Sequence, residues 1–276
     1  MKAIQPYFVM ATSEYHKEIL MKNGIAHFYK YCRDAYDVEE VMVVPDGCVD
    51  ILFEKNDKGI VGRAAGTVLE RRVIADEKEK EFFGVRFLPG VLPAVLDVSL
   101  ADLVSSEIDL GDVLYNKDML KRIEDTYDSG DWVSVFMENY QKALHQREEK
   151  KEGAAAEIVS FVQDEIMNTS GIITVAELAQ EVGYSERYVN KLFSQTTGLN
   201  PKTFGKIIQF QNALQMINEE SMAVKLTDIG ADSGYYDQAH FIKEFKKYAA
   251  LTPKEYRKLV MQCHYKERIV SNVVTV

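Results

Sequence analysis

The sequence predicts an α+β chain, with a β-rich, barrel- or sandwich-like domain in residues 1–150 and an all-α domain in residues 154–262. Three observations support this order. Short apolar runs separated by turn residues extend to about residue 90, and apolar residues recur at three- and four-residue steps from residue 113 onward. A helical pattern that begins near residue 175 is then repeated near residue 226. A chain of 276 residues is long enough for two such domains.

The composition is that of a soluble globular chain, with 46% hydrophobic and 28% charged residues. No apolar run approaches the roughly 18 residues that a membrane-spanning helix requires. The first ten residues hold one lysine and no small-residue cleavage site, so we expect no signal peptide. Three scattered cysteines form no CxxC pair, which predicts free thiols, a reducing compartment and a cytoplasmic location.

The strand patterns lie between residues 7 and 90. Residues 40–44 end at the turn sequence Pro45-Asp46-Gly47, and residues 48–53 follow as a second strand. Residues 56–59 form another turn, and residues 81–88 read as a strand that stops at Pro89-Gly90. Turns at this spacing are typical of a sandwich or a small barrel.

Residues 113–149 have a helical period and are expected to form the last helices of the first domain. Their apolar stripe could cover the sheet or form the interface of a homodimer, and we expect a homodimer. The charged stretch at residues 146–153 lacks apolar residues and is the expected linker.

A first helix–turn–helix unit is predicted at residues 174–195. Thr174 is an expected N-cap, and Glu177 completes a capping box. The helix stops at Gly183, which permits a left-handed turn, and Ser185 is the expected N-cap of the next helix.

A second unit is predicted at residues 225–248, because residues 226–235 repeat the pattern of residues 175–184 and Asp237 takes the place of Ser185. A linker helix at residues 202–218 joins the two units. A helix of about 16 residues is roughly 24 Å long. A strut of that order could hold two helices about one DNA turn, roughly 34 Å, apart.

The second helix of each unit carries side chains that suit nucleic acid. Arginine and lysine pair with guanine and phosphates, and asparagine pairs with adenine. A solvated helix face is the alternative interpretation. The net charge of −10 does not exclude DNA, because residues 1–152 hold −9 of it and local contacts determine the affinity.

These motifs resemble the AraC/XylS transcription regulators of bacteria across residues 174–258. The resemblance is carried by six segments: Ala176-x-x-Ala179-x-x-Val182-Gly183-Tyr184-Ser185, Leu192-Phe193, Thr197-Gly198-Leu199-Asn200-Pro201, Ile229-Gly230-Ala231-x-x-Gly234-Tyr235, Asp237-Gln238-x-His240-Phe241-x-x-x-Phe245-Lys246 and Thr252-Pro253-x-x-Tyr256-Arg257. It implies a seven-helix module whose two recognition helices enter successive major grooves of double-stranded DNA. RNA polymerase is a further partner that such an activator would contact.

Carried over position by position, the DNA contacts implied by the resemblance fall on Arg187, Asn190, Lys191, Gln238, His240 and Lys243. The N-caps Ser185 and Asp237 would lie beside phosphates. Three positions depart from the family pattern: Gln209 replaces an arginine, Ala249-Ala250 replaces Phe-Gly, and Ala239 is short. We expect Tyr184 and Tyr235 to lie in the core rather than to contact bases.

Residues 44–53 and 84–90 resemble a β-rich, cupin-like sensor domain found in some members, which implies a small-molecule effector. Asp50 and Arg86 lie near strand ends and are the candidate effector-binding residues, whereas Asp46 is expected to satisfy its turn. A first domain that binds a protein partner is the alternative.

An enzyme fused to a DNA-binding module is the weaker alternative. The five histidines include no HxH or HxxxH pattern for a metal, and Cys48 has no histidine nearby to activate it. An alkyl-transfer domain held by zinc would need four clustered cysteines. We therefore expect no catalytic residue, no metal site and no cofactor.

Overall fold

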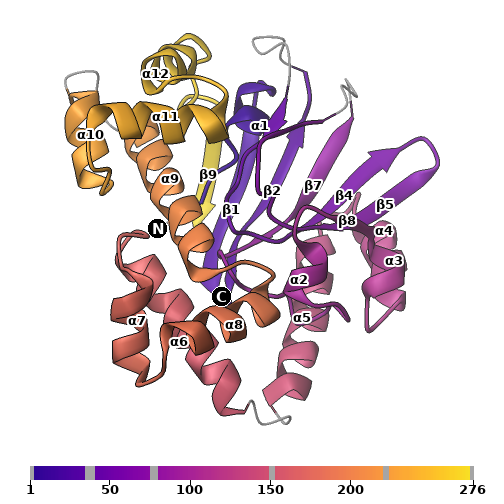
Figure 1. The fold of residues 1–276 in the computed structure, drawn as a ribbon. Helices are drawn as coiled ribbons and strands as arrows, with labels where there is room; N and C mark the ends of the chain where they lie inside the picture. Colours follow the sequence, from indigo (N-terminus) through magenta and orange to yellow (C-terminus); the bar gives the residue numbers. More distant parts are fainter. Residues whose placement is uncertain (1–2, 35–40, 75–79, 149–152, 220–223, 274–276) are drawn as a thin grey trace.

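The computed structural model describes residues 3–34, 41–74, 80–148, 153–219 and 224–273. A β-sheet occupies one side of the molecule, and helices cover both of its faces (Figure 1). The expected order, a β-sheet domain followed by an all-helical domain, is confirmed. The expected linker at residues 146–153 includes residues 149–152, which lie outside the described residues.

The main sheet has seven strands in the order β8-β5-β4-β7-β2-β1-β9. The order has two free edges, at β8 and β9, so the expected barrel does not close. Helices and the second domain cover the two faces, which removes the need for closure. The strands are β1 Tyr15–Lys22, β2 Ile25–Cys32, β4 Asp50–Asn56, β5 Gly59–Ala65, β7 Glu81–Phe87, β8 Glu107–Asp109 and β9 Ile269–Val273, and a separate two-stranded sheet pairs β3 Met42–Val43 with β6 Arg72–Val73.

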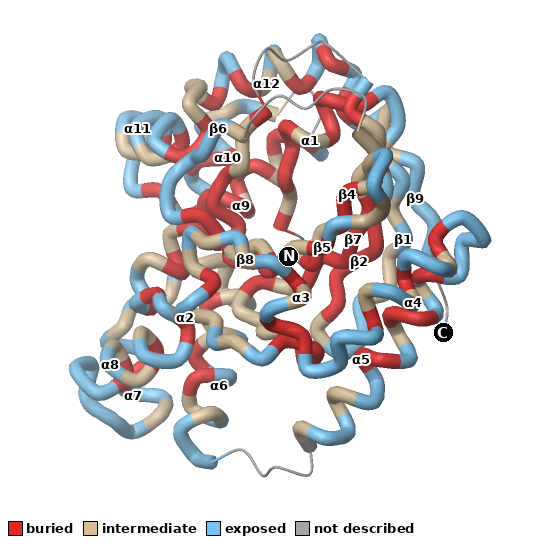
Figure 2. Tube along the Cα trace, turned by 90° about the vertical axis from the view of Figure 1, so that its right-hand side faces the viewer, coloured by how far each residue is buried: buried red, intermediate tan, exposed pale blue. Residues whose placement is uncertain are grey.

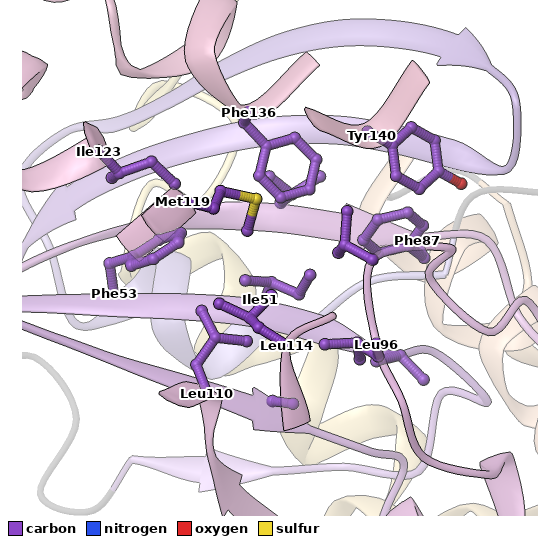
Figure 3. Packing of buried hydrophobic residues seen from close by; sticks show 14 of the residues in the cluster. Ile51, Phe53, Phe87, Leu96, Leu110, Leu114, Met119, Ile123, Phe136 and Tyr140 are labelled. Atoms are coloured by element: carbon purple, nitrogen blue, oxygen red, sulfur yellow. The ribbon is translucent and has the colours of Figure 1, made fainter. Parts of the chain in front are cut away.

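One face of the sheet is the core of the first domain. Alternate residues of the central strands, such as Ile51, Phe53 and Val85, are fully buried there. Helices pack on this face with Met119 and Phe136 pointing toward the strands (Figure 3). The apolar stripe of residues 113–149 therefore covers the sheet and is not free for a dimer. These helices are α2 Leu100–Leu103, α3 Leu110–Val113, α4 Asp118–Thr126 and α5 Trp132–Glu148.

The described part of the second domain forms seven helices, α6 to α12. The long helix α9 serves two cores: its first half contributes Phe204 and Ile208 to one, and its second half contributes Phe210 and Leu214 to the other. At 19 residues it is about 28 Å long. The helices are α6 Ala154–Asn168, α7 Val175–Val182, α8 Glu186–Thr197, α9 Pro201–Glu219, α10 Leu226–Asp232, α11 Gln238–Ala249 and α12 Pro253–Gln262.

Both ends of the chain cross to the other domain. The expected strand region begins too early: residues 7–10 belong to helix α1 (Pro6–Met10), whose Tyr7 and Met10 are buried among α9, α11 and α12. At the other end, β9 pairs in parallel with β1 and extends the sheet (Figure 1). The two domains therefore share one apolar core around the second half of α9.

Candidate nucleic-acid interface and ligand cavity

The first helix–turn–helix unit has the expected caps. The Thr174 hydroxyl accepts from the N–H of Glu177, and the Glu177 carboxylate accepts from the Thr174 N–H at 2.8 Å. Gly183 ends α7 in the left-handed conformation with φ 72°. Ser185 then caps α8 by accepting from the N–H of Tyr188 at 3.3 Å. The turn and both helix starts therefore follow from the local sequence.

The second unit repeats the turn with weaker capping. Its first helix, α10, begins after Lys225, which makes no side-chain cap bond. Gly234 takes the left-handed conformation with φ 76°, as Gly183 does. Asp237 caps α11 by accepting from the N–H of His240 at 2.7 Å.

Four of the predicted DNA-contacting residues point into solvent. Arg187 and Lys191 on α8 are exposed, as are Gln238 and Lys243 on α11. The outer sides of α8 and α11 are mostly exposed, and both views place these helices at the two ends of α9 (Figures 1 and 2). The first domain does not cover these four side chains.

Asn190 and His240 are half-buried. The Asn190 amide donates to the Glu186 carbonyl at 2.9 Å within α8. The His240 ring packs edge-on against Tyr235, with 5.6 Å between ring centres. Its Nδ1 is buried and has no hydrogen-bond partner among the described residues, so this side of the ring serves packing.

The exposed tyrosines differ from the sequence expectation. Tyr235 is 7% exposed, which confirms its core role, but Tyr184 is 48% exposed, so its expected core role is wrong. The Tyr184 ring stacks on Tyr188 with 4.8 Å between centres, next to the start of α8. Tyr236 is 93% exposed beside the start of α11. Tyr188 is 40% exposed although it directly precedes the buried Val189, because neighbouring residues point about 100° apart around a helix, and sequence reasoning missed this exposed ring.

Close backbone contacts set the two units against α9. A Cβ on Gly171 would lie 2.1 Å from the Gly205 carbonyl oxygen, so the loop before α7 touches α9 directly. A Cβ on Gly234 would lie 2.6 Å from Ile172, which brings the second turn against that same loop. The second unit also contacts α9 through an ion pair, in which Lys206 of α9 lies 3.0 Å from Glu244 of α11.

The other face of the sheet lines a cavity of about 380 Å³. This face carries the residues that alternate with the core positions, and its side chains are charged residues and tyrosines, whereas the first face carries aliphatic residues and phenylalanines. A Cβ on Gly84 would lie 2.8 Å from the Tyr29 hydroxyl, so the glycine leaves room for that ring to lie over the sheet. The aromatic side chains of the wall are Phe8, Tyr15, Tyr29, Tyr31 and Phe82.

Asp50 and Arg86, the predicted effector-binding residues, face each other across β4 and β7 in this cavity. The Arg86 guanidinium donates two bonds to the Asp50 carboxylate, at 2.6 and 3.0 Å, and lies 3.0 Å from an Asp46 oxygen. Burial raises the pKa of Asp50, and the charge of Arg86 partly opposes that rise. Asp46 also accepts from the Cys48 N–H, as its turn role predicts.

A chain of hydrogen bonds joins this charged group to α9. The Gln5 side-chain amide donates to Asp46 at 2.8 Å and to the Val44 carbonyl at 2.6 Å. Gln211 of α9 is fully buried and donates to the Pro45 carbonyl, while its oxygen accepts from the Ile4 N–H, both at 2.8 Å. The cavity wall and the helix between the two units are thus one bonded structure.

Two family models match the chain: a helix-turn-helix domain at residues 178–259 and a domain of unknown function (DUF6597) at residues 18–109. Residues 178–259 hold both units described above. This part of the chain is a helix-turn-helix domain. The seven helices α6 to α12, which begin at residue 154, agree with the module that the sequence resemblance implied.

The curated relatives match only part of this chain. An HTH-type transcriptional regulator of Haemophilus influenzae is 30% identical over 112 residues, which cover 37% of each chain. The lactose operon transcription activator of Staphylococcus xylosus is 32% identical over 85 residues, which cover 31% of this chain and 30% of that one. The matches therefore span about a third of the relatives' length.

A solved AraC-type transcriptional regulator from Chromobacterium violaceum is 22% identical, with a TM-score of 0.34, over 40% of this chain and 98% of that one. These curated relatives are transcription regulators. Among the described residues, no helix is both long and apolar enough to cross a bilayer.

Proposed function

We propose that this chain is a DNA-binding transcription regulator. The observation that carries the proposal is the pair of capped helices α8 and α11, which present exposed polar side chains at the two ends of α9. We call α8 and α11 the recognition helices. Each begins at a side-chain cap, so its first N–H groups and the positive end of its dipole can face a phosphate.

Base reading is assigned to the exposed side chains near the start of each recognition helix. Arg187 can donate two bonds to a guanine edge, and Gln238 can pair with adenine. Lys191 and Lys243 are assigned to phosphates or guanine, Asn190 to an adenine edge through its amide oxygen, and His240 to a phosphate. Ser185 and Asp237 hold the helix starts beside the backbone.

The first domain is proposed to bind a small-molecule effector in the 380 Å³ cavity that contains Asp50 and Arg86. This volume lies within the roughly 300–1,000 Å³ range of ligand pockets. Arg86 contacts Asp46, Asp46 accepts from Gln5, and the neighbouring Pro45 carbonyl accepts from Gln211 of α9. Ligand binding in the cavity can therefore affect the position of α9. We place the boundary between the effector-binding domain and the DNA-binding domain at residues 150–154. RNA polymerase contact and a homodimer belong to the same proposal, although the apolar side chains of α4 and α5 that pack on the sheet do not supply the dimer surface.

The DNA-binding role is tested with a fragment selected from random DNA by the purified chain. Arg187→Ala should weaken binding by about 1–3 kcal/mol and relax the preference at one base pair. Arg122→Ala is the matched control, because Arg122 is an exposed arginine of the first domain that pairs with Glu138. Equal operator affinity of the two variants in a gel-shift assay would refute the proposed contact.

The effector role is tested by thermal shift of the full chain against a metabolite extract. A saturable shift that also changes operator affinity supports the small-molecule site. No shift, together with a protein partner that changes operator affinity, would instead assign the first domain to protein binding.

A further inference from the structure

The cavity has a wall of aromatic rings close to one another. The Tyr15 ring lies 6.0 Å from Tyr29 and 5.5 Å from Tyr31, centre to centre. The series continues from Tyr31 to Phe82 at 5.3 Å and to Phe8 at 5.9 Å. The Tyr15 ring is nearly parallel to the rings of Tyr29 and Tyr31, with interplanar angles of 19° and 22°. The faces of such rings carry negative potential and attract cations, and proteins recognise quaternary ammonium ligands with aromatic side chains.

The charges of the cavity differ with depth. At its buried base, two carboxylates, Asp46 and Asp50, share the single guanidinium of Arg86, which leaves one net negative charge. The carboxylate side chains there are only 4% and 16% exposed. A charge held in a low-dielectric interior interacts strongly with a ligand that reaches it.

The remaining charged side chains of the wall are paired or near solvent. Glu54 is bonded to Lys80 at 2.6 Å. Arg63 and Arg72 both contact Glu107, at 2.9 and 3.4 Å, and their side chains are 44% and 43% exposed. The mouth is therefore weakly positive and the base negative, so a positive group is favoured deep in the cavity and disfavoured at its entrance.

We propose that the cavity binds a small organic cation, with its ammonium group among the rings of Tyr15, Tyr29 and Tyr31 and near Asp50. The proposal rests on the effector site of the proposed function and names its ligand class. An inorganic ion is not favoured, because the described residues hold no cluster of three or more side chains placed to bind a metal. An organic anion would meet the negative base and could pair only with the arginines of the mouth.

The first test compares two probes of the same shape, choline and its uncharged analogue 3,3-dimethylbutan-1-ol, by calorimetric titration of the full chain. We expect choline to bind at least about tenfold more tightly, because cation–π attraction and the buried charge act on it alone. Benzyltrimethylammonium and benzoate form a second pair, in which the cation should bind and the carboxylate should not. Equal binding within either pair, binding of the uncharged or anionic member alone, or no binding of either cation would overturn the proposal.

Variants connect the selectivity to this cavity. Asp50→Asn should bring the ratio of choline to analogue affinity toward one. Because Asp50 also holds Arg86, a second comparison uses Tyr15, which is half-buried. Tyr15→Phe keeps the aromatic face and should keep the ratio, whereas Tyr15→Leu should lower it several-fold; equal ratios in these two variants would contradict the proposal.

A gel-shift assay on the same samples distinguishes failure of the cation proposal from failure of the proposed function. If benzoate binds and alters operator affinity while choline does not bind, the effector site stands and the cation class is wrong. If no probe binds and Arg187→Ala still weakens operator binding, the cation proposal fails and the DNA-binding role stands.

Discussion

At the scale of single residues, Ala250 is in a conformation that suits glycine better. It ends α11 in the left-handed region with φ 65°, at the position where the related pattern has Phe-Gly. The left-handed region costs a residue with a side chain roughly 1–2 kcal/mol. The turn therefore keeps the left-handed geometry of such a loop, and the departure seen in the sequence is tolerated as local strain.

Ala250→Gly is expected to stabilise the chain by about 0.5–1 kcal/mol, because the relieved strain exceeds the extra entropy of an unfolded glycine. Ala249→Gly is the matched control: Ala249 is a buried residue of the last turn of α11, and glycine there should destabilise by about 0.5–1 kcal/mol. Denaturant unfolding measures both free energies. A loss of stability in Ala250→Gly would show that the strain is absent.

The capping box of α7 predicts a pH dependence. Hydrogen bonds from the Thr174 backbone and side chain lower the pKa of Glu177 from its ordinary value of 4.5. A folded-state pKa below the unfolded value means that the ionised carboxylate stabilises the fold above pH 4.5 and that this contribution is lost as pH falls through the folded pKa.

Glu177→Gln should therefore be less stable than the parent chain near pH 7, and the difference should shrink as pH falls below about 4. Unfolding by denaturant at several pH values measures this difference. A gap of constant size across that range would contradict the assigned bonds.

At the scale of elements, the two turns look alike in sequence but differ in their surroundings. Gly183 and Gly234 share the left-handed conformation, with φ 72° and 76°. A Cβ on Gly183 would meet no atom within 4 Å, whereas a Cβ on Gly234 would lie 2.6 Å from Ile172. The second turn is thus also a contact between the two units, and the first is not.

Gly183→Ala is expected to destabilise the chain by about 1 kcal/mol through backbone strain alone. Gly234→Ala should destabilise it by more, because the loop at Ile172 must also move. The difference between the two free energies of unfolding measures the contact. Equal losses would mean that the second turn does not rest on that loop.

The elements with local signals could be predicted from the sequence. The capping box of Thr174 and Glu177, Gly183 and the Asp237 cap predicted both helix–turn–helix units, and the turn at residues 56–59 joins β4 to β5 as expected. The sequence predicts a barrel- or sandwich-like sheet and leaves its closure open, because alternating strands do not show whether their edges meet. The exposed position of Tyr184 was missed because the turn residue can face either the core or solvent.

Long-range pairing had no local signal either. Tyr7-Phe8-Val9-Met10 is too short a segment for its period to separate helix from strand, and its partners lie more than two hundred residues away. Asp50 and Arg86 were named for their place near strand ends, but their pairing with Asp46 and the ring wall around them depend on the register of β4, β7 and β2.

At the scale of the whole molecule, the second recognition unit depends on the first residues of the chain. Tyr7 is 2% exposed, its hydroxyl donates to the Ala249 carbonyl at 2.6 Å, and its ring lies 6.4 Å from that of Tyr256. A substitution at Tyr7 should therefore change the stability of α11 and α12, although these helices lie more than two hundred residues later in the sequence.

Tyr7→Ala is expected to destabilise the region around α11 and α12 by about 3 kcal/mol through the cavity it leaves. Hydrogen exchange should show faster exchange in those helices and little change in α7 and α8. Phe8→Ala is the control, because Phe8 is half-buried and lines the ligand cavity. Equal loss of protection in both units would contradict the division into two cores.

The most direct measurement is the sequence preference of DNA fragments selected by the parent chain, by Arg187→Ala and by Gln238→Ala. If α8 and α11 enter successive major grooves, each variant should relax a different short set of base pairs, and the two sets should lie about 10 base pairs apart. If both variants relaxed the same base pairs, or if neither changed the preference, the two helices would not be reading one duplex side by side.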